Sequence, residues 1–152
     1  MFRITETKKS AIIREIRGKL NKQSMEQKTE NEISYLIRGA IFKVYNALGP
    51  GLLESAYEAV LCFELQKQGL EVKRQVPLPV FYDSVELEIG FRLDLLVNNK
   101  VIIEIKSVDR VAKVHHKQLL TYLKLTELKL GILVNFNVDN ITDGIFRKVN
   151  GL

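Results

Sequence analysis

The amino-acid sequence predicts one domain of the mixed α/β (α+β) class, with its core elements in the order α, β, β, β, α, β. Three observations support this prediction. Residues 31–48 repeat apolar side chains at helical spacing until Gly49-Pro50-Gly51 interrupts them. Two apolar runs of strand character meet at Asn98-Asn99, which is typical of a tight hairpin turn. A helical pattern at 113–126 then leads directly into an apolar strand at 129–136.

The remaining elements follow from periodicity and from turn residues. The first helix is expected to bury one stripe, formed by Ile33, Leu36, Ile37, Ala40, Ile41, Val44, Tyr45 and Leu48. A second helix from Leu52 to Gln68 ends at Gly69, and its expected core stripe is Leu53, Ala56, Val60 and Phe63. Strand-like runs cover 71–82, 85–97 and 100–108, and the tail at 144–150 predicts a short edge strand.

Length and composition are those of an ordinary globular domain. The chain has 152 residues, of which 46% are hydrophobic and 27% charged. No apolar run approaches the roughly 20 residues of a membrane span, and the N-terminus lacks the apolar centre of a secretory signal. We therefore expect a cytoplasmic protein without membrane contact, in which the single cysteine, Cys62, is a buried structural thiol.

The excess positive charge lies in an N-terminal extension. Residues 1–24 contain seven Lys and Arg and two Glu, which equals the net charge of +5 of the whole chain. A short amphipathic helix is expected at 10–22, with Ile12, Ile13, Ile16 and Leu20 on one side, followed by a polar linker up to Thr29. The sequence thus predicts that the chain consists of an extension at 1–29 and a domain at 30–152. The extension is either a functional arm or an upstream start, since Met25 begins a plausible shorter protein. Any nucleic-acid contact must come from this arm or from a local patch.

Charged residues occur within the apolar hairpin, at Asp94, Glu104 and Lys106. Side chains alternate along a strand, so Glu104 and Lys106 share a face, and a hairpin can bring Asp94 to the same point. The tripeptide Glu-x-Lys is itself unspecific, because it recurs elsewhere, for example at Glu127/Lys129. Only the copy at Glu104 lies inside an apolar run, where charged side chains are rare without a partner or a metal.

Two helices carry further candidates. Glu54 opens the second helix, where the helix dipole favours a carboxylate, so a structural and a functional role are both open. His115, Gln118 and Tyr122 occupy i, i+3 and i+7 of the later helix, on a face separate from the core face of Leu119, Leu120 and Leu123. This polar face is either the solvated side of the helix or one wall of a cleft. The two histidines are adjacent, which supports neither a protein zinc site nor a Ser-His-Asp relay.

Five short motifs in order make the chain resemble the PD-(D/E)XK nuclease superfamily and, within it, the bacterial GxxExxY family. They are Gly51-x-x-Glu54-x-x-Tyr57, Gly90-x-Arg92-x-Asp94, Glu104-x-Lys106, Gln118-x-x-x-Tyr122 and the run from Leu130 to Phe136. The resemblance covers about residues 30–152 and implies a restriction-endonuclease-like αβββαβ core with a mixed central sheet flanked by helices. Leu93 replaces the proline that names the motif, and that proline contributes no metal ligand.

The resemblance, together with electrostatics, implies a metal site. Two like charges about 4 Å apart repel by roughly 4 kcal/mol at an effective dielectric constant near 20, so converging carboxylates need compensation. Hard oxygen ligands favour Mg²⁺ or Mn²⁺ over zinc. Asp94, Glu104 and the backbone carbonyl of Ile105 would bind the metal, and Glu54 would hold a metal-bound water or a second ion. Lys106 would orient the attacking water or stabilise negative charge, and the substrate contacts would come from Arg92, His115, Gln118 and Tyr122.

The sequence thus predicts a metal-dependent phosphodiesterase that acts on nucleic acid, with DNA favoured over RNA. Two rivals stay open. One is a module on the same fold that binds nucleic acid or protein without cutting, and the other is a hydrolase of a smaller phosphate ester or nucleotide. A homodimer is compatible with the sequence, which does not determine oligomeric state.

Overall fold

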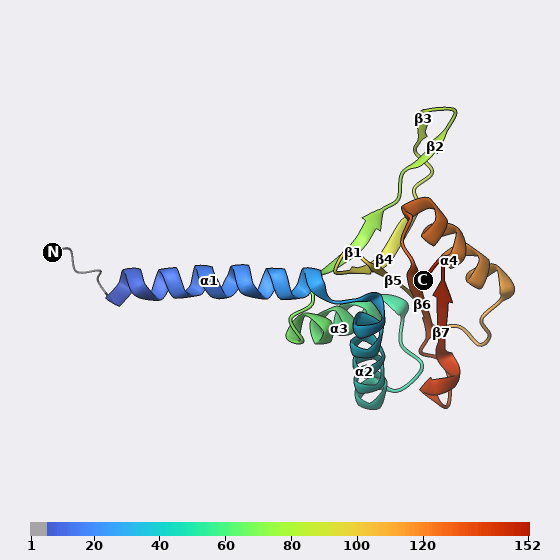
Figure 1. The fold of residues 1–152 in the computed structure, drawn as a ribbon. Helices are drawn as coiled ribbons and strands as arrows, with labels where there is room; N and C mark the ends of the chain where they lie inside the picture. The colour runs from blue at the N-terminus through green and yellow to red at the C-terminus, as the bar shows by residue number, and fades with distance from the viewer. Residues whose placement is uncertain (1–5) are drawn as a thin grey trace.

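The computed structural model describes residues 6–152 and confirms a mixed α+β domain (Figure 1). Residues 1–5 of the predicted extension lie outside the described part. The elements are α1 (Glu6–Gln27), α2 (Glu30–Leu48), α3 (Glu54–Lys67), β1 (Val72–Pro77), β2 (Val80–Tyr82), β3 (Val85–Leu87), β4 (Arg92–Val97), β5 (Val101–Lys106), α4 (Lys113–Thr126), β6 (Leu130–Asn135), a 3-10 turn η1 (Ile141–Gly144) and β7 (Ile145–Val149). Within the described range, every helix is too short or too polar to span a membrane.

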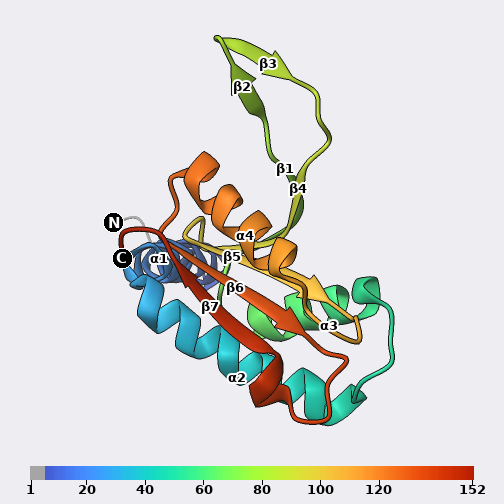
Figure 2. The same cartoon turned by 90° about the vertical axis from the view of Figure 1, so that its right-hand side faces the viewer.

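The core is a five-stranded mixed sheet between two helical layers. Its strand order is β1-β4-β5-β6-β7, in which β5 and β6 run parallel and the other neighbours antiparallel. Helices α2 and α3 cover one face and α4 covers the other (Figure 2). The predicted mixed sheet flanked by helices is therefore confirmed, and the tail adds β7 as the predicted edge strand.

Helix α2 begins and packs as its sequence predicts. The Thr29 hydroxyl accepts the Glu32 backbone N–H at 3.2 Å, and the Glu32 carboxylate accepts the Thr29 N–H at 2.8 Å. This reciprocal capping box satisfies backbone donors that a helix start leaves unpaired. The buried residues all belong to the predicted stripe: Ile33, Ile37, Ala40, Ile41 and Val44.

Helix α3 buries a different face from the predicted one. The sequence predicts Leu53 and Phe63 in the core, but their side chains are 78% and 59% exposed. The buried face is instead Tyr57, Glu58, Leu61, Cys62 and Leu65. Apolar residues occur at helical spacing on more than one side of this helix, so periodicity alone could not choose between the sides. Cys62 is buried as predicted, and Glu58 is turned toward the sheet.

The predicted strand runs at 71–82 and 85–97 are each divided in two. Pro77, Pro79 and Gly90 interrupt them, and proline lacks the N–H that a sheet ladder needs. The Leu78 N–H still donates to the Phe91 carbonyl at 2.8 Å. Beyond this contact, β2 and β3 form a separate two-stranded sheet that projects from the body of the molecule (Figures 1 and 2).

Helix α1 is longer than predicted. It spans Glu6–Gln27, so most of the expected linker after residue 20 is helical. The reason is that residues 21–27 contain neither Gly nor Pro, and polar composition by itself does not end a helix. The helix projects away from the sheet (Figure 1), and its apolar residues Ile12, Ile13, Ile16 and Leu20 are exposed.

Tyr57 fixes the loop between α2 and α3. Its hydroxyl donates to the Gly49 carbonyl at 2.6 Å and accepts the Leu52 N–H at 3.1 Å. Its ring stacks on Phe136 with centroids 4.3 Å apart. Gly49 and Gly51 have φ values of 66° and 97°, a region in which a side chain is disfavoured. The motif tyrosine is thus a structural anchor that sets where α3 begins.

Replacing Tyr57 with Phe should therefore destabilise the fold through one lost hydroxyl. We expect the free energy of unfolding, measured by urea denaturation, to fall by about 1–2 kcal/mol, because two loop groups lose their partner. The control is Tyr35→Phe, since Tyr35 is 79% exposed. Equal effects of the two substitutions would contradict an anchoring role for the Tyr57 hydroxyl.

Candidate active site

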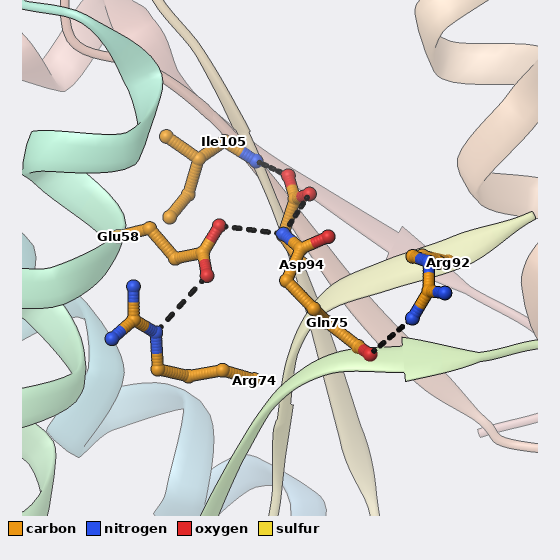
Figure 3. A network of polar contacts seen from close by, with 6 residues as sticks. All are labelled: Glu58, Arg74, Gln75, Arg92, Asp94 and Ile105. Carbon is orange, nitrogen blue, oxygen red and sulfur yellow. Dashed lines mark hydrogen bonds and ion pairs between the residues drawn. The ribbon is translucent and has the colours of Figure 1, made fainter.

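Asp94 and Glu104 meet where the central sheet divides. The ladder between β4 and β5 joins Val97 to Val101, Leu96 to Ile102 and Leu95 to Ile103. At the next position the carboxylates accept the backbone N–H groups in place of the ladder. The Asp94 N–H donates to Glu104 Oε1 at 3.2 Å. The Ile105 N–H donates to Asp94 Oδ2 at 2.8 Å (Figure 3). Beyond this point β4 stays paired with β1, and β5 stays paired with β6.

Burial makes this carboxylate pair electrostatically costly. Glu104 is only 5% exposed, and its pKa is raised to about 8, first by burial and then by the negative charge of Asp94. Burial also raises the pKa of Asp94, while the Ile105 N–H acts in the opposite direction. At neutral pH Glu104 therefore holds a proton, and the two carboxyl groups share one negative charge.

Lys106 supplies positive charge near the pair. It is partly exposed at the end of β5, and its ammonium lowers the pKa of both Asp94 and Glu104. It takes part in none of the ion pairs found among residues 6–152. The structure thus brings Asp94 and Glu104 into contact, with Lys106 close enough for its charge to act on both, and the ammonium is left available to interact with a ligand.

A third acidic residue, Glu58 of α3, lies close to Asp94. Its carboxylate lies 3.1 Å from Arg74 Nε and 2.8 Å from the Gln75 side-chain amide (Figure 3). The same Gln75 amide lies 3.4 Å from Asp94 Oδ1, so it bridges the two carboxylates. Gln75 lies between the ladder pairs Arg74–Leu95 and Val76–Leu93 and is itself left out of the ladder. Its φ of 49° is strained for a residue other than glycine.

Glu54, the helical carboxylate singled out from the sequence, is engaged elsewhere. Its Oε1 accepts the Ser107 N–H at 3.1 Å, and the Ser107 hydroxyl donates to the Leu52 carbonyl at 2.6 Å. Glu54 therefore ties the start of α3 to the residue after Lys106. Glu58 lies one turn further along the same side of α3 and faces Asp94.

On α4, Tyr122 lies close enough to Glu104 and Asp94 for their charges to act on it, and Gln118 contacts Tyr122. Gln118 Nε2 donates to the Tyr122 hydroxyl at 2.9 Å. Burial raises the pKa of Tyr122, and the nearby Glu104 raises it further. The predicted separation of Tyr122 from the core was wrong: the side chain is 5% exposed and packs with Leu119 and Leu123, because its ring is apolar although its hydroxyl is not.

The remaining candidates lie at the margin of the site. His115 Nδ1 accepts the Ala112 N–H at 3.1 Å and so caps the start of α4. Arg92 is exposed on β4, with Nη1 3.4 Å from the Gln75 carbonyl (Figure 3). Ile105 contributes its N–H to Asp94; the metal-binding role expected for its carbonyl stays a prediction.

The donor set suits a hard divalent cation with few protein ligands. No group of three or more His, Cys, Asp or Glu side chains within residues 6–152 is arranged to hold a metal ion. Asp94 and Glu104 nevertheless offer two adjacent carboxylates. Mg²⁺ is commonly bound by one or two carboxylates, with waters and substrate phosphates as its other ligands. A cation would also replace the proton that burial now retains on Glu104, so the residues fit Mg²⁺ or Mn²⁺.

Sequence reasoning missed Glu58 and Gln75. One signal for Glu58 was present, since it shares helical spacing with Tyr57, Leu61 and Leu65, and a carboxylate within an apolar stripe is unusual. The wrong choice of core face for α3 concealed it. Gln75 gave no signal, because its position depends on the register of β1 with β4.

Comparison with known proteins identifies a family. A family model described as the PD-(D/E)XK nuclease superfamily matches residues 31–148. The matched range includes all the residues of the site and most of the described elements. Searches of curated proteins and of solved structures returned no significant match.

The raised pKa of Glu104 predicts how stability depends on pH. An unfolded glutamate titrates near pH 4.3, whereas the folded pKa is about 8, so the folded state binds one more proton between these values. Stability of the metal-free protein should therefore decrease as pH rises through this window, by at most about 1.4 kcal/mol per pH unit for one proton. Glu104→Gln should remove this component and be as stable as the wild type or more stable at pH 8.

Urea denaturation at several pH values tests this expectation. The matched control is Glu127→Gln, which changes an exposed carboxylate in the surface copy of Glu-x-Lys. The control should keep the pH dependence of the wild type. A Glu104→Gln variant with that same dependence would show that Glu104 is not the group that retains the proton.

Proposed function

Because the chain belongs to the PD-(D/E)XK nuclease superfamily, we propose that it is a Mg²⁺- or Mn²⁺-dependent nuclease that hydrolyses phosphodiester bonds in nucleic acid, with DNA as the favoured substrate. The observation that carries the proposal is the contact of buried Glu104 with half-buried Asp94, beside Lys106, at the point where the ladder between β4 and β5 ends. The pattern Gly51-x-x-Glu54-x-x-Tyr57 supports a finer assignment, to the GxxExxY family.

Asp94 and Glu104 would hold the cation. When bound, it would supply Lewis-acid activation of the scissile phosphate and of water. Glu104 must first lose its proton, because a neutral carboxyl is a poor ligand. Glu58 is the nearest further carboxylate, and we propose it, alongside Glu54 and the Ile105 carbonyl, as the source of additional ligands or of contacts to bound water.

The cationic and polar groups around the pair would position the substrate. Lys106 would stabilise the negative charge that develops on the phosphate, a task for which a compact ammonium is suited. Tyr122 accepts a hydrogen bond from Gln118, which leaves its own hydroxyl proton available to a phosphate oxygen. Arg92, exposed on β4 two residues before Asp94, and His115 at the start of α4 would contact the neighbouring backbone.

One observation favours a second candidate, a module that binds nucleic acid or protein without cutting. The Gln75 amide lies between Glu58 and Asp94, and Glu54 is satisfied by Ser107. These contacts stabilise carboxylates without a cation. A cleavage assay with and without a divalent metal separates the two functions.

The test compares cleavage of labelled DNA and RNA in Mg²⁺, Mn²⁺ and EDTA. We expect metal-dependent cleavage by the wild type. Lys106→Ala should lose about 100-fold or more in rate, because its charge acts on the transition state, yet it should still bind Mn²⁺ in calorimetric titration. Asp94→Asn should lose both binding and cleavage.

The matched control is Lys129→Ala, since Lys129 is exposed in the surface copy Glu127-x-Lys129. It should cleave at the wild-type rate. Wild-type protein that binds Mn²⁺ and nucleic acid but cuts neither DNA nor RNA would favour the non-cleaving module. Normal cleavage by Lys106→Ala would remove that residue from the mechanism.

A further inference from the structure

The β2–β3 hairpin presents an apolar face that lacks a covering layer. Val80 pairs with Leu87, and Tyr82 pairs with Val85, so these four side chains share one face of the ribbon. Tyr82 is 72% and Val85 58% exposed. A two-stranded hairpin is marginally stable on its own and is normally completed by a third strand or by a helix packed on its apolar face.

Helix α1 also exposes apolar side chains that a partner could cover. Its apolar stripe consists of Ile12, Ile13, Ile16 and Leu20, which are 46% to 58% exposed. Each side chain described in this helix is exposed, so α1 is not packed against the domain. Helices in proteins gain most of their stability from packing an amphipathic face, and this one has no partner within the described part of its own chain.

The two segments also have opposite charge. Residues 78–91 contain Asp83, Glu86 and Glu88 but no Lys or Arg, which gives −3. Residues 6–27 contain six Lys and Arg and three Glu, which gives +3. Ion pairs within α1, Lys9 with Glu6 and Lys19 with Glu15, leave this excess unchanged. An acidic apolar ribbon would repel phosphates, so it suits a basic amphipathic helix better than nucleic acid.

Within one copy, α1 and the hairpin project in different directions and lie apart (Figures 1 and 2). We propose that α1 of one copy packs on the apolar face of the β2–β3 hairpin of a second copy. A two-fold axis makes the contact reciprocal, so each copy donates one helix and receives one. The proposal does not rest on nuclease activity, because the residues of the site lie outside both segments.

Sedimentation equilibrium of the full chain over a range of concentrations tests the proposal. We expect a dimer for the wild type. A helix variant, Ile13→Glu with Ile16→Glu, and a hairpin variant, Tyr82→Ser with Leu87→Ser, should each raise the dissociation constant by at least about tenfold. The control is Ala11→Glu: at about 100° per residue Ala11 lies on the side of α1 opposite Ile13 and Ile16, so this variant should stay dimeric.

Mixing the two variants gives the decisive result. A dimer of either variant alone lacks both helix–hairpin contacts. A heterodimer of the two variants regains one contact, because the hairpin variant supplies an intact helix and the helix variant supplies an intact hairpin. Association should therefore reappear in the mixture, while the melting temperatures of the separate variants show that their cores stay folded. A monomeric wild type, a mixture that does not associate, or a hairpin variant that dimerises normally would each overturn the proposal.

Discussion

The repulsion between two adjacent carboxylates, buried Glu104 and half-buried Asp94, is the constraint around which the site is organised. Apart from Arg92 and Lys106 at the strand ends, both carboxylates lie among apolar residues, and the backbone ladder between β4 and β5 runs only as far as Leu95–Ile103. The carboxylates accept the N–H groups of Asp94 and Ile105 at that point, which keeps backbone donors satisfied while the strands part. The remaining charge is reduced by a proton on Glu104 and by nearby Lys106. A purely structural role would gain little from this arrangement, since burial and like-charge repulsion both disfavour the ionised carboxylates.

Helix α3 and strand β1 hold the pair in place. Tyr57 anchors the loop before α3, so that Glu54 meets Ser107 just after Lys106 and Glu58 faces Asp94 one turn later. Gln75 adopts a left-handed backbone conformation to bridge Glu58 and Asp94. Local strain of this kind, which costs about 1–3 kcal/mol, persists where the surroundings determine the conformation, and it commonly occurs at functional sites.

The sequence was sufficient where a single periodicity decided the structure. Helix α2 and the hairpin that brings Asp94 to Glu104 were predicted, because one apolar pattern defined the helix and one turn signal defined the hairpin. The orientation of α3 was not predicted, since its apolar residues lie on more than one side. The proximity of Glu58 to the site was missed for the same reason. The burial of Tyr122 and the role of Gln75 depend on contacts between elements far apart in the chain, and local pattern contains no information about them. The sequence predicted β2 and β3 as parts of the longer strands at 71–82 and 85–97. A proline within an edge strand and a proline at a strand end cannot be distinguished from the sequence.

We expect a divalent cation to replace the proton held by Glu104 when it binds. Calorimetric titration of the protein with Mn²⁺ at pH 7, repeated in buffers of different ionisation enthalpy, counts the protons released on binding. With a pKa of about 8, Glu104 is largely protonated at this pH, so we expect release of close to one proton per ion bound. Glu104→Gln should show neither tight binding nor proton release. A binding enthalpy for the wild type that is the same in every buffer would contradict this mechanism. The ion would then bind without displacing a proton from Asp94 or Glu104.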